Sequence, residues 1–127
     1  MRLRKEPKVW FKRDIMNKNE VIGHIQLVDY MIGKATPHIE YSIDEEYRNQ
    51  GIMSTELPKY LKLCKKHDVY QLLAVTLEDN IPSQKVLEKS GFMYLSKIDD
   101  KMTYIIDIRL TRREVEKTIK MMKDYYG

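Results

Sequence analysis

Residues 42–57 read Ser42-Ile-Asp-Glu-Glu-Tyr-Arg-Asn-Gln-Gly-Ile-Met-Ser-Thr-Glu-Leu57, and they predict a strand end, a tight turn and the start of a helix. The strand is expected to begin at residue 38 and to end at residue 43. Its alternation places Tyr41 and Ile43 on one face and Glu40 and Ser42 on the other. The other predicted strands and helices lie before and after this stretch in the chain.

The turn before the helix contains the residues that could bind a ligand. Gly51 permits a sharp turn and lets a ligand approach the main chain closely. The free N–H groups of a helix start, with the positive end of its dipole, form a site suited to phosphate. Arg48 adds a fixed positive charge. An ordinary strand–turn–helix connection with a glycine in its turn explains the same residues, so this stretch alone leaves both interpretations open.

A second stretch, Asn80-Ile-Pro-Ser83-Gln-Lys-Val-Leu-Glu-Lys-Ser-Gly91-Phe92, follows an apolar run at residues 72–77 that predicts a buried strand. Arg-x-x-Gly-x-x after one strand, followed by Asn-x-x-Ser-x-x-x-Leu-Glu-Lys-x-Gly-Phe near the next helix, resembles the GNAT superfamily of N-acetyltransferases. The resemblance is closest to the branch that includes the ribosomal-protein N-terminal acetyltransferases, and it covers roughly residues 21–110.

The resemblance implies an α/β (α+β) fold: a mixed, mostly antiparallel central sheet with a splay between two strands, flanked by helices. It also implies acetyl-CoA as the acyl donor and a primary amine, either a small molecule or a protein N-terminus, as the acceptor. The pantetheine arm is expected along the strand backbone, and the pyrophosphate at the helix start. The residues expected to bind acetyl-CoA are Tyr41, Ser42, Ile43, Arg48, Asn49, Gln50, Gly51, Ile52, Met53, Ser54, Asn80 and Ser83.

Direct acyl transfer to an amine needs a base, an oxyanion donor and a proton for the departing thiolate. By the resemblance, the backbone N–H near Ile43 is the oxyanion donor and Ser83 is the thiolate proton donor. Glu40 is the candidate base from its position, although a solvent-facing carboxylate explains it equally well. Two residues depart from the family: Leu87 replaces a frequent tyrosine, and Met53 replaces a usual small residue.

The expected elements, in order, are three strands, a helix, a strand, a helix, two strands and a helix. Their expected ranges are strands 9–15, 21–28 and 38–43, a helix after Gly51 that ends at the stretch 65–68, strand 72–77, a helix from Pro82 to Gly91, strands 92–98 and 102–110, and a final helix opened by the capping box Thr111-Arg-Arg-Glu114. Pro58 is expected to kink the first helix or to force its restart.

Residues 1–127 are expected to form a single GNAT-like domain. GNAT domains usually begin with a strand and two helices, and no segment here corresponds to them. The final helix, residues 110–127, carries an apolar stripe at Val115, Ile119, Met122 and Tyr126 that must bury against the sheet or against a second subunit. A homodimer is therefore one expectation.

The charges are concentrated at the two ends of the chain, which has a net charge of +4. Basic ends could meet nucleic acid, but no aromatic or glycine interleaving marks a binding groove, so solvated charges are the favoured interpretation. The single cysteine, Cys64, fits a reducing cytoplasm and a buried helix position. No membrane span is expected, and no spacing of ligand residues predicts a metal.

Two functions therefore compete. The first is an active, cytoplasmic, acetyl-CoA-dependent N-acetyltransferase. The second is a truncated, non-catalytic acyl-CoA-binding or interaction module, favoured by Leu87, Met53 and the absent N-terminal helices.

Overall fold

The computed structural model describes residues 2–32 and 36–126. The described elements are β1 (Arg2–Asn17), β2 (Glu20–Ile32), β3 (His38–Ile43), a 3-10 turn η1 (Glu45–Tyr47), α1 (Ile52–Lys66), β4 (Gln71–Leu77), α2 (Ile81–Lys89), β5 (Met93–Ile98), β6 (Lys101–Asp107) and α3 (Arg112–Tyr126). Their order confirms the expected succession of strands and helices. The loop expected between the second and third strands falls partly on residues 33–35, outside the described residues.

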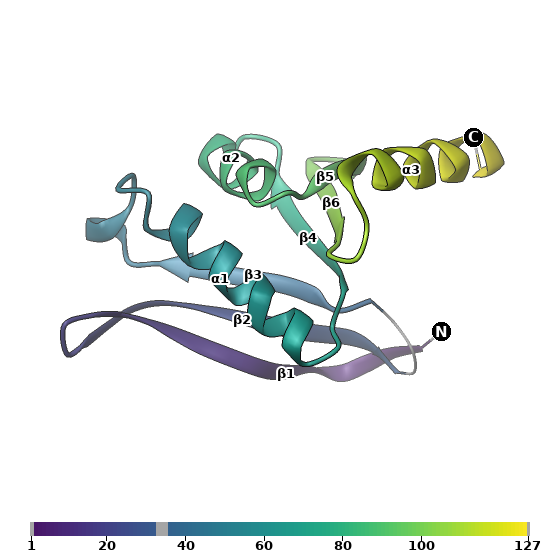
Figure 1. Cartoon of the computed structure of the whole chain (residues 1–127). Helices are drawn as coiled ribbons and strands as arrows, with labels where there is room; N and C mark the ends of the chain where they lie inside the picture. The colour runs from purple at the N-terminus through teal and green to yellow at the C-terminus, as the bar shows by residue number, and fades with distance from the viewer. Residues whose placement is uncertain (1, 33–35, 127) are drawn as a thin grey trace.

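All six strands lie in one sheet with the order β1-β2-β3-β4-β6-β5. The β3–β4 pair is parallel, and the other four pairs are antiparallel. β3 pairs with β2 at six positions and β4 with β6 at seven, but among the described residues β3 and β4 pair only at His38 and Leu73. The two halves of the sheet therefore diverge beyond that point, as Figure 1 shows. The expected mixed sheet with a splay is confirmed.

One hydrophobic core joins α1 and α2 to the sheet. From α1 it takes Leu57, Tyr60 and Cys64, each with no exposed surface. The Tyr60 hydroxyl donates a hydrogen bond to the Phe11 carbonyl oxygen at 2.6 Å, which ties the helix to β1. Burial raises the pKa of the Cys64 thiol to about 12, and the expected buried helix position is confirmed.

α1 runs as one helix through Pro58, so the expected restart is wrong. A proline in a helix interior loses one backbone hydrogen bond and crowds the preceding turn. Here the helix is held across that defect because Leu57, Tyr60 and Leu61 on either side of Pro58 are buried in the core.

β1 departs from the strict alternation of a regular strand within residues 9–15. The β1–β2 register shifts between Trp10 and Arg13, and Phe11 takes a positive φ of 57°. This bulge turns both aromatic side chains toward the core, where Phe11 meets the rings of Tyr60 and His67 edge-on. Strict alternation along residues 9–15 would put Phe11 and Trp10 on opposite faces, but a bulge places two residues opposite one.

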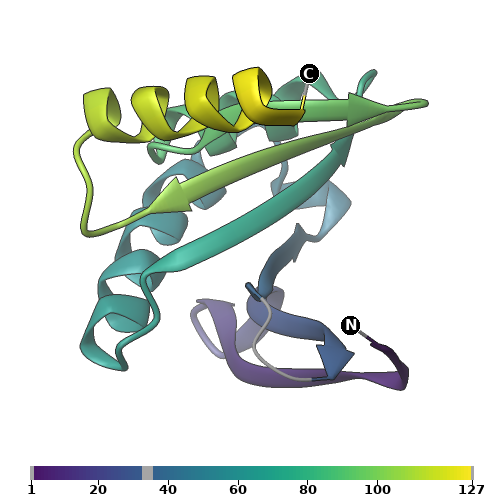
Figure 2. The same ribbon diagram turned by 90° about the vertical axis from the view of Figure 1, so that its right-hand side faces the viewer.

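α3 lies along β5, as Figure 2 shows. Its capping box is confirmed: the Thr111 N–H donates to Glu114 Oε2 at 2.9 Å, and the Glu114 N–H donates to Thr111 Oγ1 at 3.3 Å. Val115 and Ile119 of the expected stripe are buried, whereas Met122 is 38% exposed. The helix therefore packs on its own sheet through the first half of that stripe.

Candidate functional site

The site begins where β3 leaves β4. Beyond His38, no pairing with β4 is recorded for the described residues of β3, so the backbone at Tyr41, Ser42 and Ile43 has its β4 side open. Open backbone of this kind can accept an extended ligand in the manner of an added strand. β2 holds the other edge of this segment through a close approach at Gly23, whose α-carbon would carry a Cβ only 2.4 Å from the Ser42 carbonyl oxygen.

The turn between β3 and α1 places the N-terminus of α1 beside the unpaired edge of β3. The Arg48 guanidinium Nε donates to the Ile43 carbonyl oxygen at 3.0 Å, which folds this side chain back over the strand end. Asn49 and Gly51 both have positive φ, 62° and 75°. Gly51 is the N-cap of α1 and offers no side chain to the first-turn N–H groups. These groups remain available to an anion.

α2 supplies the opposite wall. The Asn80 side chain accepts a hydrogen bond from the Ser83 N–H at 3.2 Å and so caps this helix. The Ser83 hydroxyl lies 2.8 Å from the Tyr41 hydroxyl, which also donates to the Ser83 carbonyl oxygen at 3.3 Å. Tyr41 thus spans the gap between β3 and α2, and its burial raises the pKa of its phenol.

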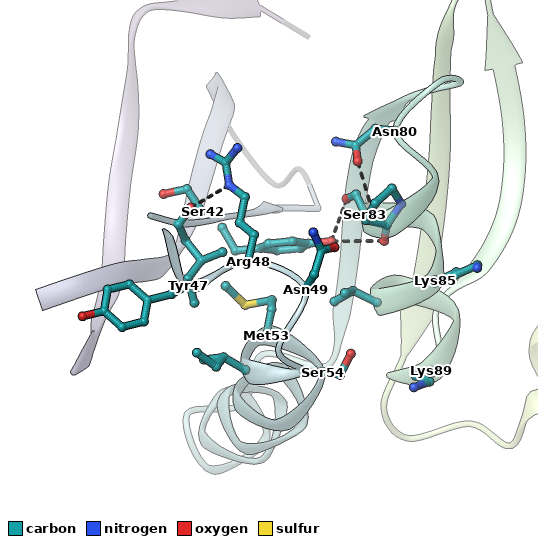
Figure 3. Close-up of a pocket in the computed structure, with 16 residues that line it drawn as sticks. Ser42, Tyr47, Arg48, Asn49, Met53, Ser54, Asn80, Ser83, Lys85 and Lys89 are labelled. Atoms are coloured by element: carbon teal, nitrogen blue, oxygen red, sulfur yellow. Dashed lines mark hydrogen bonds between the residues drawn. The ribbon is translucent and has the colours of Figure 1, made fainter. Parts of the chain in front are cut away.

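Together these walls enclose an open cleft of about 680 Å³. Figure 3 shows it between Ser42 and Arg48 on one side and Asn80 and Ser83 on the other. Among the described residues that line the cleft three are cationic and none is acidic. The lining consists of Tyr41, Ser42, Ile43, Tyr47, Arg48, Asn49, Gly51, Ile52, Met53, Ser54, Asn80, Pro82, Ser83, Lys85, Val86 and Lys89. A long anionic ligand with an extended neutral arm suits this combination of charge and open backbone.

Residues 3–93 match the protein family described as the acetyltransferase (GNAT) domain. This stretch includes the cleft, both of its helices and most of the sheet. The chain belongs to the GNAT family.

Solved structures of other GNAT-type proteins share the fold. The ribosomal-protein-S5-alanine acetyltransferase from Vibrio fischeri matches with a TM-score of 0.62 and 21% identity, over 71% of this chain and 56% of that one. A GNAT acetyltransferase from Bacillus anthracis matches with a TM-score of 0.64 and 26% identity, over 76% and 64%. Mycobacterium smegmatis RimJ, solved with CoA-disulfide, matches with a TM-score of 0.66 and 20% identity, over 76% and 52%.

This GNAT chain therefore spans between about half and two thirds of the length of these structures. A search of curated proteins finds no match.

The cleft brings together most of the residues that the sequence singled out. Of the twelve residues expected to bind acetyl-CoA, eleven line it, and Gln50 does not. The Gln50 side chain instead donates to the Glu46 carbonyl oxygen at 3.1 Å. Met53 lines the cleft as well, but it is only 6% exposed and packs into the core.

Five lining residues were not anticipated: Tyr47, Pro82, Lys85, Val86 and Lys89. Lys85 and Lys89 are four residues apart on α2, a spacing that places them on one helix face. That spacing was visible in the sequence. The position of these lysines relative to Arg48 was not, because the two segments are far apart in the chain and only the fold brings them to one cleft.

Glu40, the candidate base, lies elsewhere. It is on the opposite face of β3 from Tyr41 and is not among the residues that line the cleft. Its carboxylate accepts a hydrogen bond from the Tyr30 hydroxyl, which raises the pKa of Tyr30 to about 12. His38 meets the Tyr30 ring edge-on, and burial lowers the pKa of its imidazole. Glu40, Tyr30 and His38 form a polar cluster behind the strand.

Within residues 2–32 and 36–126, no three histidine, cysteine, aspartate or glutamate side chains gather as a metal site requires. No helix in that part of the chain combines the length and apolar character needed to cross a membrane.

Proposed function

We propose that this GNAT chain is an acetyl-CoA-dependent N-acetyltransferase that moves an acetyl group to a primary amine by direct attack in a ternary complex. The observation that carries the proposal is the cleft itself. It joins a free strand edge, an uncapped helix start and three cationic side chains in one place. CoA presents a matching succession of groups: an extended amide-bearing arm and several phosphates.

The residues of the cleft divide by the part of acetyl-CoA that they would hold. The backbone of Tyr41, Ser42 and Ile43 would hold the pantetheine arm. The N–H groups from Ile52 to Ser54 would hold the pyrophosphate, because a helix N-terminus favours negative charge. The cationic side chains Arg48, Lys85 and Lys89 would neutralise the remaining phosphate charge.

The reaction joins the amine nitrogen to the acetyl carbon and breaks the thioester carbon–sulfur bond. The backbone N–H near Ile43 would stabilise the developing oxyanion. Ser83, already in the cleft wall, would face the departing thiolate. Glu40 is the proposed base, acting from behind β3, where it is paired with Tyr30.

The proposed enzyme is a single domain, is cytoplasmic and forms a homodimer. Residues 1–127 are proposed to work as one domain, which the shared sheet and core support. A cytoplasmic location agrees with the single buried cysteine, Cys64. A homodimer would use Met121 and Met122 of α3, which are 71% and 38% exposed. The acceptor is a small amine or a protein N-terminus.

Isothermal titration calorimetry with acetyl-CoA, CoA and ATP tests the binding step. We expect selective binding of acetyl-CoA and CoA, and loss of binding in Gly51→Trp, whose side chain would start from a helix cap with positive φ in the cleft wall. We also expect Lys85→Glu/Lys89→Glu to weaken binding by on the order of tenfold or more.

The matched control is Lys62→Glu/Lys66→Glu. It makes the same change of charge at the same spacing on α1, at exposed positions outside the cleft. Equal loss of binding in both double variants would show that net charge, not the cleft, governs affinity. Absence of acetyl-CoA binding by the unaltered protein would overturn the proposal.

A non-catalytic acyl-CoA-binding module is the second candidate. Leu87 favours it, because this replacement for the family's frequent tyrosine is only 1% exposed and belongs to the core. An assay of free CoA release with a panel of primary amines and N-terminal peptides separates the two candidates. Binding without turnover for any acceptor would favour the module.

A further inference from the structure

The hydrogen bond between Tyr41 and Ser83 has a chemical consequence for the proposed reaction. The two hydroxyl oxygens lie 2.8 Å apart, although their residues are 42 positions apart in the chain. Both side chains line the cleft. The family's frequent tyrosine is absent from α2, where Leu87 stands, but β3 brings a different phenol to the same helix.

A serine hydroxyl alone is a poor acid toward a thiolate. A thiol has a pKa of about 8.5, and a phenol has one of about 10. An aliphatic hydroxyl is a far weaker acid than either of them. Ser83 can therefore protonate a departing thiolate only if its own oxygen receives a proton in the same event. The Tyr41 hydroxyl lies within hydrogen-bond distance of Ser83 Oγ, where either oxygen can be the donor, and it can turn its proton from the Ser83 carbonyl oxygen to Ser83 Oγ.

We propose that Tyr41 supplies the proton that Ser83 passes to the departing CoA thiolate; this inference rests on the acetyltransferase function proposed above. As the carbon–sulfur bond breaks, the thiolate takes the Ser83 proton and Ser83 takes the Tyr41 proton. The phenolate then regains a proton from water, and the proton released by the acceptor ammonium leaves to solvent. Tyr41 is a positioning and proton-supplying residue that acts through Ser83.

The surroundings of Tyr41 keep the phenol protonated. Tyr104 of β6 lies near it, and the charged side chains that share its cleft are Arg48, Lys85 and Lys89. Burial is the largest influence on the Tyr41 phenol and raises its pKa. The hydrogen bond with Ser83 lowers this pKa to a smaller extent, so Tyr41 holds its proton more firmly than an exposed tyrosine does.

The kinetic test compares Tyr41→Phe, Ser83→Ala and the double variant, with Tyr70→Phe as control. Tyr70 is also hydrogen-bonded, to Asp68, but lies outside the cleft. With acetyl-CoA and a primary amine at pH 7, we expect Tyr41→Phe to lower kcat by on the order of 100-fold. The KM for acetyl-CoA should change less than twofold, and the double variant should be no slower than Ser83→Ala.

The pH profile separates proton supply from a merely structural effect. Above a pH of about 8.5 the product thiol is ionised without help, so the deficit of Tyr41→Phe should shrink there. A deficit that is constant from pH 6.5 to 9.5, or single-variant effects that multiply in the double variant, would overturn the proposal.

A second measurement needs no acceptor amine. In protein labelled with 13C at the tyrosine ζ carbon, the resonance missing from Tyr41→Phe identifies Tyr41. CoA should shift this resonance more than desulpho-CoA, which lacks the thiol. Equal shifts would overturn the proton-supply role while leaving acetyl-CoA binding intact. If the unaltered protein binds neither CoA nor acetyl-CoA, the proposed function itself has failed, and this inference fails with it.

Discussion

Gly23 shows how a single residue on β2 governs the strand that forms the cleft. It lies directly against the Ser42 carbonyl, so the β2–β3 spacing at this point depends on the missing side chain. Because Ser42 and Ile43 are the proposed partners of pantetheine, the effect of this glycine extends into the site.

We expect Gly23→Ala to destabilise the protein by about 1–3 kcal/mol, since a strand backbone must move to admit the added carbon. Urea unfolding followed by circular dichroism measures the change. Val21→Ala, at a 53% exposed position on the same strand, is the control. If Gly23→Ala is as stable as the wild type, the β3 backbone can move to admit the added methyl group without a loss of stability, and the prediction is contradicted.

Asp107 is a second residue whose substitution should change the stability of the protein measurably. It is 6% exposed and accepts hydrogen bonds from both the backbone N–H and the guanidinium of Arg109. The Arg109 side-chain hydrogen bond lowers the pKa of Asp107 below its usual value. This turn also ends β6 at Asp107, whereas the sequence pattern extended the strand to Leu110.

A carboxylate with a lowered folded-state pKa stabilises the protein above its unfolded pKa, and this contribution is lost as the pH falls through the folded pKa. Asp107→Asn should therefore cost about 1 kcal/mol at pH 7, a modest value because Arg109 is largely exposed. The gap between wild type and variant should close as the pH falls below about 4. Unfolding curves at pH 7, 5 and 3 test this, and a gap that widens toward pH 3 would contradict it.

At the scale of elements, the start of α2 couples helix stability to the site. Asn80 caps the helix by accepting from the Ser83 N–H, and Ser83 in turn bonds Tyr41 across the cleft. One cap therefore positions the hydroxyl pair as well as the first helical turn.

Asn80→Ala should cost about 1 kcal/mol, the usual effect of losing an N-cap. It should also speed amide exchange in the first turn of α2. Asn80→Asp keeps an acceptor oxygen at the cap and should restore both properties. Hydrogen exchange measured by mass spectrometry checks the local effect. Exchange in α2 that is unchanged in Asn80→Ala would show that the cap does not hold the turn.

At the scale of the whole molecule, few backbone hydrogen bonds join the two described halves of the sheet. The single His38–Leu73 pair and the hydrogen bond from the Leu73 N–H to the Pro37 carbonyl, at 3.0 Å, join β3 to β4. The bond between Tyr41 and Ser83 is a further link between the halves. A ligand in the cleft would touch both halves at once.

Acetyl-CoA at 100 times its dissociation constant should therefore stabilise the protein by about 2.7 kcal/mol. For a chain of this size, we expect the melting temperature to rise by about 10 °C. Amide exchange should slow in β3, in the first turn of α1 and in the first turn of α2. Lys85→Glu/Lys89→Glu is the control at the same ligand concentration. Protection confined to one half would contradict a ligand that bridges them.

The sequence by itself determined the local structure of this protein. The strand at 38–43, the Gly51 turn, the helix between Pro82 and Gly91 and the Thr111 capping box follow from the pattern of a few neighbouring residues. Such features depend on backbone preferences, hydrophobic period and caps, all of which act over one or two turns. Eleven of the twelve residues expected at the cofactor site lie on these features, and the structure places them along one cleft.

Only the tertiary structure decided which residues from distant segments meet. The bulge at Phe11 reassigned the faces of β1, and strand pairing placed Glu40 behind the cleft rather than in it. The same pairing brought Tyr41 to Ser83 and set Lys85 on the wall opposite Arg48. The physical reason is that strand register and splay are set by packing between segments tens of residues apart, and a shift of one residue turns every side chain to the other face.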